Sequence, residues 1–172
     1  MITTLEIGSI VVATRAVLEF NQVYADTLAV DFRRTADGTG HIRSTGTGKL
    51  TTQISGRGWM PAGLAGIDVT ETHVIKCAMP RDYSSATTTV SIPSARRSDA
   101  GHTPYAYAVV DGDEVATEIT DITDDVATCT AVAGASHYTV YIFPEITAHI
   151  TRLEHRGQAS AVYSWALDAE EM

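Results

Sequence analysis

The side chains in this sequence that most often bind metals are six histidines and two cysteines. They are His41, His73, His102, His137, His149, His155, Cys77 and Cys129. No two histidines are four residues apart, as a metal site on a helix requires, and the cysteines lack Cys-x-x-Cys spacing. His149 and His155 have the even offset that places residues on one face of a strand, but Arg156-Gly157 indicates a turn at His155. The sequence therefore predicts no metal site and no cofactor.

The candidate nucleophiles and phosphate loops also lack the surroundings that such chemistry needs. Ile54-Ser55-Gly56-Arg57-Gly58 only superficially resembles a nucleophile elbow, because glycines and Pro61 follow it instead of a helix. Cys77 lies in an apolar run, which is typical of a buried thiol. The stretch Ser44–Lys49 lacks the residues that a Walker loop requires at the positions of Arg43 and Leu50, and it is interpreted as a flexible β-turn.

Two acidic clusters, at residues 111–114 and 121–125, contain the oxygen ligands that calcium prefers. The order of an EF-hand is absent, and aspartate is a natural turn residue, so acidic β-turns are the favoured interpretation. Paired carboxylates for glycoside hydrolysis depend on separation in space and stay open, although 2 Trp and 3 Phe are few for an all-β hydrolase. The sequence therefore favours a non-enzymatic protein with a binding or assembly role.

Composition restricts the partners. The 172 residues include 12 Lys+Arg and 21 Asp+Glu, a net charge of -9 that disfavours nucleic-acid binding and attraction to anionic membranes. Hydrophobic residues make up 44%, enough for a core, and no apolar run reaches the length of a membrane span. No secretion signal is recognised at residues 1–15. Two cysteines cannot form a disulfide framework, so both are expected to be reduced core residues.

The residue types predict an all-β protein with little helix. Val, Ile and Thr number 15, 13 and 24 against 7 Leu, and β-branched side chains suit strands. Residues 28–34 and 41–43 flank Asp37-Gly38 as a hairpin would. A strand is predicted at 49–55. In the glycine-rich loop 56–66 that follows, Trp59 and Leu64 are expected to fold back as apolar anchors.

The pattern changes at residue 82. Five short strands are predicted at 87–92, 105–110, 114–119, 127–133 and 138–143. Residues 82–144 contain nine acids and two bases, a net charge of -7. We predict a split core domain of residues 1–81 and 145–172, a β-barrel or sandwich, with 82–144 as an inserted acidic sandwich-like domain. One continuous β-sandwich is the alternative. After a turn at 156–158 a last strand is predicted at 160–167, and a short helical turn at 67–72 or 168–172.

Several stretches together resemble a known class of proteins. Leu18-Glu19-Phe20-Asn21-Gln22-Val23-Tyr24, residues 32–38, residues 49–68, residues 75–81 and the closing residues 161–171 carry the likeness. The sequence resembles small structural proteins encoded among the tail genes of long-tailed bacteriophages and prophages. The likeness covers residues 18–81 and 160–171 best, and its motifs have no catalytic content.

This resemblance implies a tail-tube-like or baseplate-proximal β protein, located in the virion tail and made in the bacterial host cytoplasm. Its expected partners are copies of itself in a ring, hexameric or trimeric, and tube, hub or sheath components. Because Arg and Trp are enriched in interface hot spots, Arg33, Arg34, Arg57 and Trp59 are the candidate subunit contacts. The alternatives are a head decoration or head–tail connector protein and a carbohydrate-binding, receptor-recognising β-sandwich.

Overall fold

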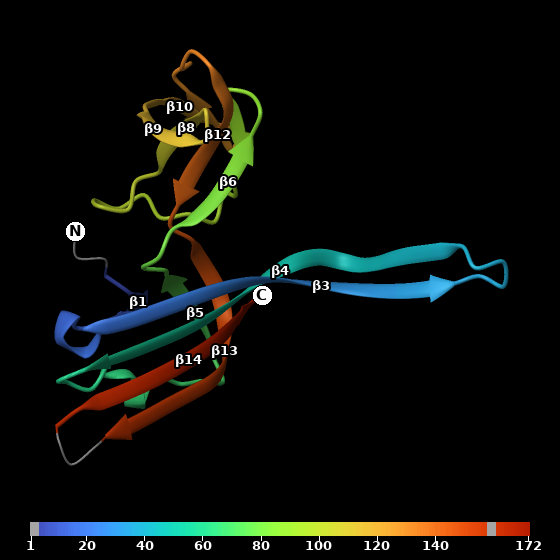
Figure 1. Ribbon diagram of the computed structural model, residues 1–172. Coiled ribbons are helices and arrows are strands. Elements are labelled where there is room, and N and C mark those ends of the chain that lie inside the picture. Colours follow the sequence, from blue (N-terminus) through green and yellow to red (C-terminus); the bar gives the residue numbers. More distant parts are fainter. Residues whose placement is uncertain (1–3, 158–160) are drawn as a thin grey trace. The chain divides into compact units, whose positions relative to one another are not determined.

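The computed structural model describes residues 4–157 and 161–172 of the chain. It divides into two compact units. Unit 1 comprises Met1–Val11 and Val74–Ile146, and unit 2 comprises Val12–His73 and Thr147–Met172. The boundaries at 82 and 144 that the sequence suggested both lie within unit 1. Figure 1 traces the chain through them.

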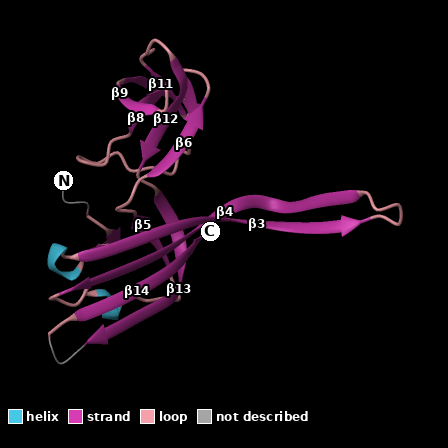
Figure 2. Cartoon of the chain, viewed as in Figure 1, coloured by secondary structure: helices cyan, strands magenta, loops and turns pink. Residues whose placement is uncertain are grey.

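The prediction of an all-β protein is confirmed. Figure 2 shows strands throughout and only two short helical turns in the described chain. The strands that lie wholly in unit 1 are β1 (Glu6–Ile7), β2 (Ile10–Val11), β6 (Arg81–Ser85), β7 (Thr89–Ser91), β8 (Tyr105–Val110), β9 (Asp113–Thr117), β10 (Ile119–Thr123), β11 (Val126–Cys129) and β12 (Ala135–Ile142). The elements that lie wholly in unit 2 are η1 (Thr14–Ala16), β3 (Glu19–Arg34), β4 (Gly40–Gly58), η2 (Leu64–Gly66) and β14 (Tyr163–Glu171). Two strands contain a unit boundary: β5 (Thr72–Lys76), most of which is in unit 1, and β13 (Glu145–Gly157), most of which is in unit 2.

Unit 1 contains a four-stranded sheet, β6-β12-β8-β9, and a three-stranded sheet, β10-β11-β7. Alternation along β8 places Ala106 and Ala108 in the core and leaves Tyr105 and Tyr107 on the other face. Buried residues of both sheets form one core. They are Val90, Ile92, Ala106, Ala108, Ala127, Cys129, Tyr138, Val140 and Ile142. This arrangement is consistent with a sandwich.

Unit 2 is built on the antiparallel strand order β13-β14-β4-β3. Opposed buried residues such as Leu167 and Ile54 define its inner face. Trp165 stands opposite Gly56, where a Cβ atom would lie 2.6 Å from the indole, so the glycine provides the room that the buried ring needs. The indole Nε1 donates a hydrogen bond of 3.1 Å to the carbonyl of Ala16, which joins η1 to the sheet.

The structure corrects several predicted elements. No sheet in the described chain closes into a barrel, so the predicted β-barrel is wrong, and a sandwich-like arrangement is consistent with the several sheets of the chain. Residues 168–171 continue strand β14 and form no helical turn, because Asp168 and Ala169 pair with Gln53 and Thr52 of β4. Strands β6 and β10 were not predicted. Gln158 in the predicted turn and Ser160 at the predicted strand start lie outside the described residues.

Candidate functional site

Strands β3 and β4 form the longest hairpin of the described chain. Their register runs from Glu19 opposite Arg57 to Arg34 opposite Gly40. β14 pairs with β4 only from Gly58 to Thr51, so the pairs from Ala29 opposite Thr45 onward belong to two strands alone. We call residues 29–45 the ribbon; Figure 1 shows it continuing past the end of β14. A two-stranded ribbon is marginally stable in water without further packing, which makes this one a candidate contact surface.

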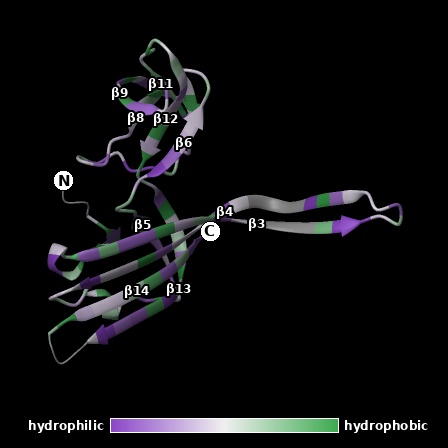
Figure 3. Cartoon of the chain, in the orientation of Figure 1, coloured by the Kyte–Doolittle hydropathy of each residue, from purple (hydrophilic) through white to green (hydrophobic). Residues whose placement is uncertain are grey.

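The ribbon tip, residues 32–43, exposes both apolar and basic side chains. Phe32 and Ile42 are cross-strand partners and are 55% and 72% exposed. The Arg34 guanidinium lies 5.7 Å from the centre of the Phe32 ring, a cation–π contact. The tip contains three arginines (Arg33, Arg34 and Arg43) and one carboxylate, Asp37. Figure 3 colours the end of β3 as hydrophilic. A basic tip on an acidic protein is suited to an acidic partner surface.

The turn of the ribbon is ordered by local hydrogen bonds. Gly38 has a φ of +85° and its amide donates to the Thr35 carbonyl, 2.9 Å away, so the predicted Asp-Gly turn is confirmed. The Asp37 carboxylate accepts hydrogen bonds from the Thr35 hydroxyl and from the Thr39 amide. These bonds lower the pKa of Asp37, the Thr35 hydroxyl contributing most. The turn at residues 35–39 is therefore stabilised by hydrogen bonds within itself.

The other predicted contact residues lie at the opposite end of the hairpin. Arg57 forms an exposed ion pair with Glu19, 3.6 Å away. The expectation that Trp59 is an apolar anchor is wrong, because its side chain is 68% exposed, whereas Leu64 is buried as predicted. The Trp59 amide donates a hydrogen bond of 2.9 Å to the Arg15 carbonyl. Trp165 fills the core position instead.

The four predicted residues therefore form two surfaces and not one site. Arg33 and Arg34 are at the ribbon tip, and Arg57 and Trp59 are at or beyond the far end of β4. With 19 residues, β4 spans about 60 Å at about 3.3 Å per residue. β3 is also the outermost strand of this sheet, and β4 is its partner in the described chain. Such a long edge strand is a template for pairing with another chain.

A further surface, in unit 1, was not predicted to be functional. Tyr105, Tyr107 and Tyr141 share the outer face of the four-stranded sheet, and the rings of Tyr105 and Tyr141 stack at 5.1 Å and 8°. The Tyr107 ring stands perpendicular to both. We call these tyrosines, with Glu114 on β9 and Asp82 on β6, the tyrosine–acid face. The Tyr105-x-Tyr107 spacing showed two of its members, but only strand pairing brings in the others.

The carboxylates affect these tyrosines. The Tyr141 hydroxyl donates a long hydrogen bond of 3.5 Å to Glu114, and Asp82 is the cross-strand partner of Tyr141. Burial first, and then the charge of Glu114, raises the pKa of Tyr141. Burial likewise raises the pKa of Tyr105. The face thus combines three phenol rings with two carboxyl side chains at its margins.

Unit 1 also contains a buried arginine. The Arg97 side chain is fully buried, and it binds Asp99 through Nε at 2.9 Å and through Nη2 at 2.7 Å. Its Nη1 donates to the carbonyls of Thr4 and Cys77 at 2.7 and 3.0 Å. The guanidinium of Arg97 lowers the pKa of Asp99 well below its ordinary value. These contacts link the first residues of unit 1 to the segment after β5, so Arg97 has a structural role.

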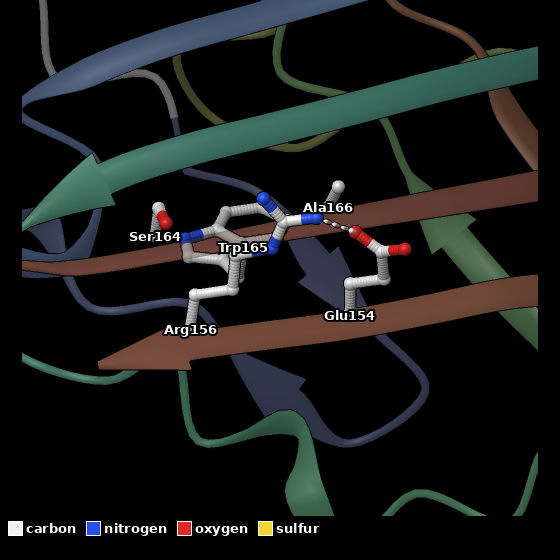
Figure 4. Close-up of a pocket in the computed structure, with 5 residues that line it drawn as sticks. All are labelled: Glu154, Arg156, Ser164, Trp165 and Ala166. Carbon is white, nitrogen blue, oxygen red and sulfur yellow. Dashed lines mark hydrogen bonds and ion pairs between the residues drawn. The ribbon is translucent and has the colours of Figure 1, made fainter. Parts of the chain in front are cut away.

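The remaining candidates for chemistry do not assemble into a site. A shallow depression on the outer face of β13 and β14 is lined by Glu154, Arg156, Ser164, Trp165 and Ala166. Figure 4 shows the Arg156–Glu154 ion pair, 3.3 Å long, lying across it. Cys77 and Cys129 are buried free thiols, and burial raises the pKa of Cys129. In the residues that the structure describes, no three His, Cys, Asp or Glu side chains are grouped as metal ligands.

Comparison with known proteins adds no family. No protein-family model matches the sequence, and a search of curated proteins also found no match. Across residues 4–157 and 161–172, no helix has the length and apolar character needed to cross a membrane. The surfaces described above are therefore the basis for assigning a function.

Proposed function

We propose that this protein is a non-enzymatic structural subunit of a bacteriophage tail, which assembles with copies of itself into a ring at the tail tube or baseplate. The observation that supports this most is the ribbon. It exposes Phe32 and Ile42 on a hairpin of two strands, and such a hairpin is only marginally stable in water without further packing. A neighbouring subunit that covers these side chains would stabilise the ribbon in the assembled state. The resemblance to tail proteins supports the choice of assembly.

The hairpin also indicates the type of contact. Its two exposed surfaces, the tip and the region of Trp59, are at opposite ends of β4 and differ in chemistry. A contact in which the tip of one copy binds a different surface of the next copy is heterologous. Heterologous contacts generate rings when the rotation closes and filaments when it does not. A ring or a stack of rings is the product expected of a tail component.

Shortening the ribbon tests the proposal directly. In the variant, residues 28–48 are replaced by Asn-Gly, which joins the paired residues Thr27 and Lys49 with a turn suited to a two-residue hairpin. The positions where β14 pairs with β4 are untouched. We expect the variant to fold, with circular dichroism and tryptophan fluorescence like those of the full chain. It should remain monomeric where the full chain self-associates in sedimentation velocity runs from micromolar to millimolar concentration.

Two results would overturn the proposal. One is a full chain that stays monomeric over the whole range and forms no rings or tubes in electron micrographs. The other is a shortened variant that assembles as well as the full chain. The place in the particle is tested separately, by immunogold labelling of virions from the phage or prophage that encodes the chain. Label on the tail supports the proposal, and label on the head supports a decoration or connector protein instead.

A further inference from the structure

We propose that the tyrosine–acid face of unit 1 is the docking site for the ribbon tip of a second copy of this chain. This inference rests on the proposed function, because it names the surface that the ribbon contacts. It adds a specific receptor, formed by Tyr105, Tyr107, Tyr141, Glu114 and Asp82. None of these residues belongs to the four contact residues that the sequence suggested.

The chemistry of the face is suited to arginine. Guanidinium groups stack on aromatic rings and pair with carboxylates, and both partners are present within one sheet surface. Glu114 is exposed and its neighbour across the strands is Val109, two residues from Tyr107. Asp82 is exposed beside Tyr141 on the other flank. Two negative charges therefore flank a cluster of three aromatic rings.

The ribbon tip has the complementary chemistry. In the ribbon, the three arginines Arg33, Arg34 and Arg43 outnumber the two acids, Asp37 and Asp31, whereas residues 82–144 have a net charge of -7. Arg34 already lies on an aromatic ring, that of Phe32, so its guanidinium is presented together with apolar surface. When the tip docks, the ring of Phe32 can pack against the tyrosines of the face while the guanidinium of Arg34 pairs with Glu114 or Asp82. Opposite charges of this size also speed the encounter of two copies.

The face is open at its margin. β9 is the outer strand of the four-stranded sheet, and four of its five residues are exposed. Ala116, which is opposite Tyr107, is one of them. A small residue there leaves the side of the Tyr107 ring without a bulky neighbour on β9. A ribbon approaching from this edge would meet the tyrosines and Glu114 together.

A glycan is a less suitable occupant of the same face. Tyr105 and Tyr141 are nearly parallel at 5.1 Å and cover one face of each other, which limits stacking by a sugar and by a guanidinium alike, so charge distinguishes the two occupants. The basic tip of the same chain also offers a charge complement that a neutral glycan lacks.

Disulfide trapping between two full-length variants tests the docking. One variant carries Thr39→Cys at the exposed tip, and the other carries Ala116→Cys at the margin of the face. The matched control replaces Ala116→Cys with Thr120→Cys, which is equally on an exposed edge strand but in the other sheet. We expect the tip and face variants to form a mixed dimer about tenfold faster than the tip and control variants. Because the cysteines are on different chains, only contact between copies is detected.

Charge reversal provides a second measurement. Arg34→Glu in the tip variant and Glu114→Arg in the face variant should each slow trapping about tenfold, and the two together should restore it. Equal trapping at residues 116 and 120 would overturn the docking site, as would tyrosine-dependent binding on a glycan array. If the full chain self-associates and the shortened variant does not, but trapping is equally fast at residues 116 and 120, this docking site alone is refuted. A full chain that never self-associates refutes the proposed function as well.

Discussion

Replacing Gly58 with alanine is expected to destabilise unit 2 by about 3–4 kcal/mol. A Cβ atom at this position would lie 2.1 Å from the Arg15 carbonyl oxygen and 2.8 Å from backbone atoms of Ala16. Ordinary contact begins at 3.4 Å, so η1 would have to move by more than an ångström. Two hydrogen bonds depend on its position, from the Trp59 amide to Arg15 and from the Trp165 indole to Ala16.

Tryptophan fluorescence during urea unfolding is a direct assay, since both tryptophans are in unit 2. The variant should unfold at lower urea with an unchanged slope, and its melting temperature should fall by about 10 °C. Gly66→Ala is the matched control, because nothing lies within 4 Å of a Cβ atom there. The control should stay within about 0.5 kcal/mol of the wild type.

The result that would refute this reasoning is a Gly58→Ala protein with the unfolding midpoint of the Gly66→Ala control. It would mean that η1 is not held against the end of β4. The hydrogen bond from the Trp59 amide to the Arg15 carbonyl depends on the same close approach.

Three other outcomes are expected. Trp165→Ala should cost about 3–5 kcal/mol in urea unfolding because it empties a core site, whereas Trp59→Ala should change stability by less than about 0.5 kcal/mol; equal effects would contradict the assignment of the two rings. Arg97→Met should destabilise unit 1 by about 3 kcal/mol, since Asp99 and three carbonyls lose their donor, and near-ultraviolet circular dichroism of the tyrosines would follow it. The pKa of Asp99 lies below its ordinary value of 3.8 in the folded protein, so the stability that the ion pair with Arg97 adds is complete well above pH 3.8 and is lost as the pH falls below that value. Asp99→Asn should therefore flatten the acid unfolding curve, and an unchanged curve would argue against the ion pair.

Local chemistry was enough to predict parts of the fold. The alternation of Tyr105 and Tyr107 with Ala106 and Ala108 separates the two faces of β8, because successive side chains of a strand point to opposite faces, and in the structure the alanine face is the buried one. Asp37-Gly38 identified the turn of the ribbon, because glycine adopts positive φ without strain. Both signals act within a few residues of each other, and the structure confirms both.

The candidate surfaces depend on longer-range pairing. The predicted strands at 28–34 and 49–55 belong to a single hairpin, and nothing in their residue types indicates that β14 pairs with only part of β4. The tyrosine–acid face combines side chains from four strands that lie up to 59 positions apart, from Asp82 to Tyr141. Strand order decides such neighbours, and strand order is a property of the whole sheet.

By itself, the sequence determined that the chain is β-rich, acidic and punctuated by Asp-Gly turns, because β-branching, charge and glycine backbone freedom act residue by residue. The tertiary structure decided which tryptophan is buried and which is exposed. Each lies near a glycine of β4, but Gly56 accommodates the ring of Trp165 while Gly58 admits η1, whose Arg15 carbonyl accepts a hydrogen bond from the Trp59 amide. The physical reason is that a core site accommodates one indole, and only packing between distant segments determines which one occupies it.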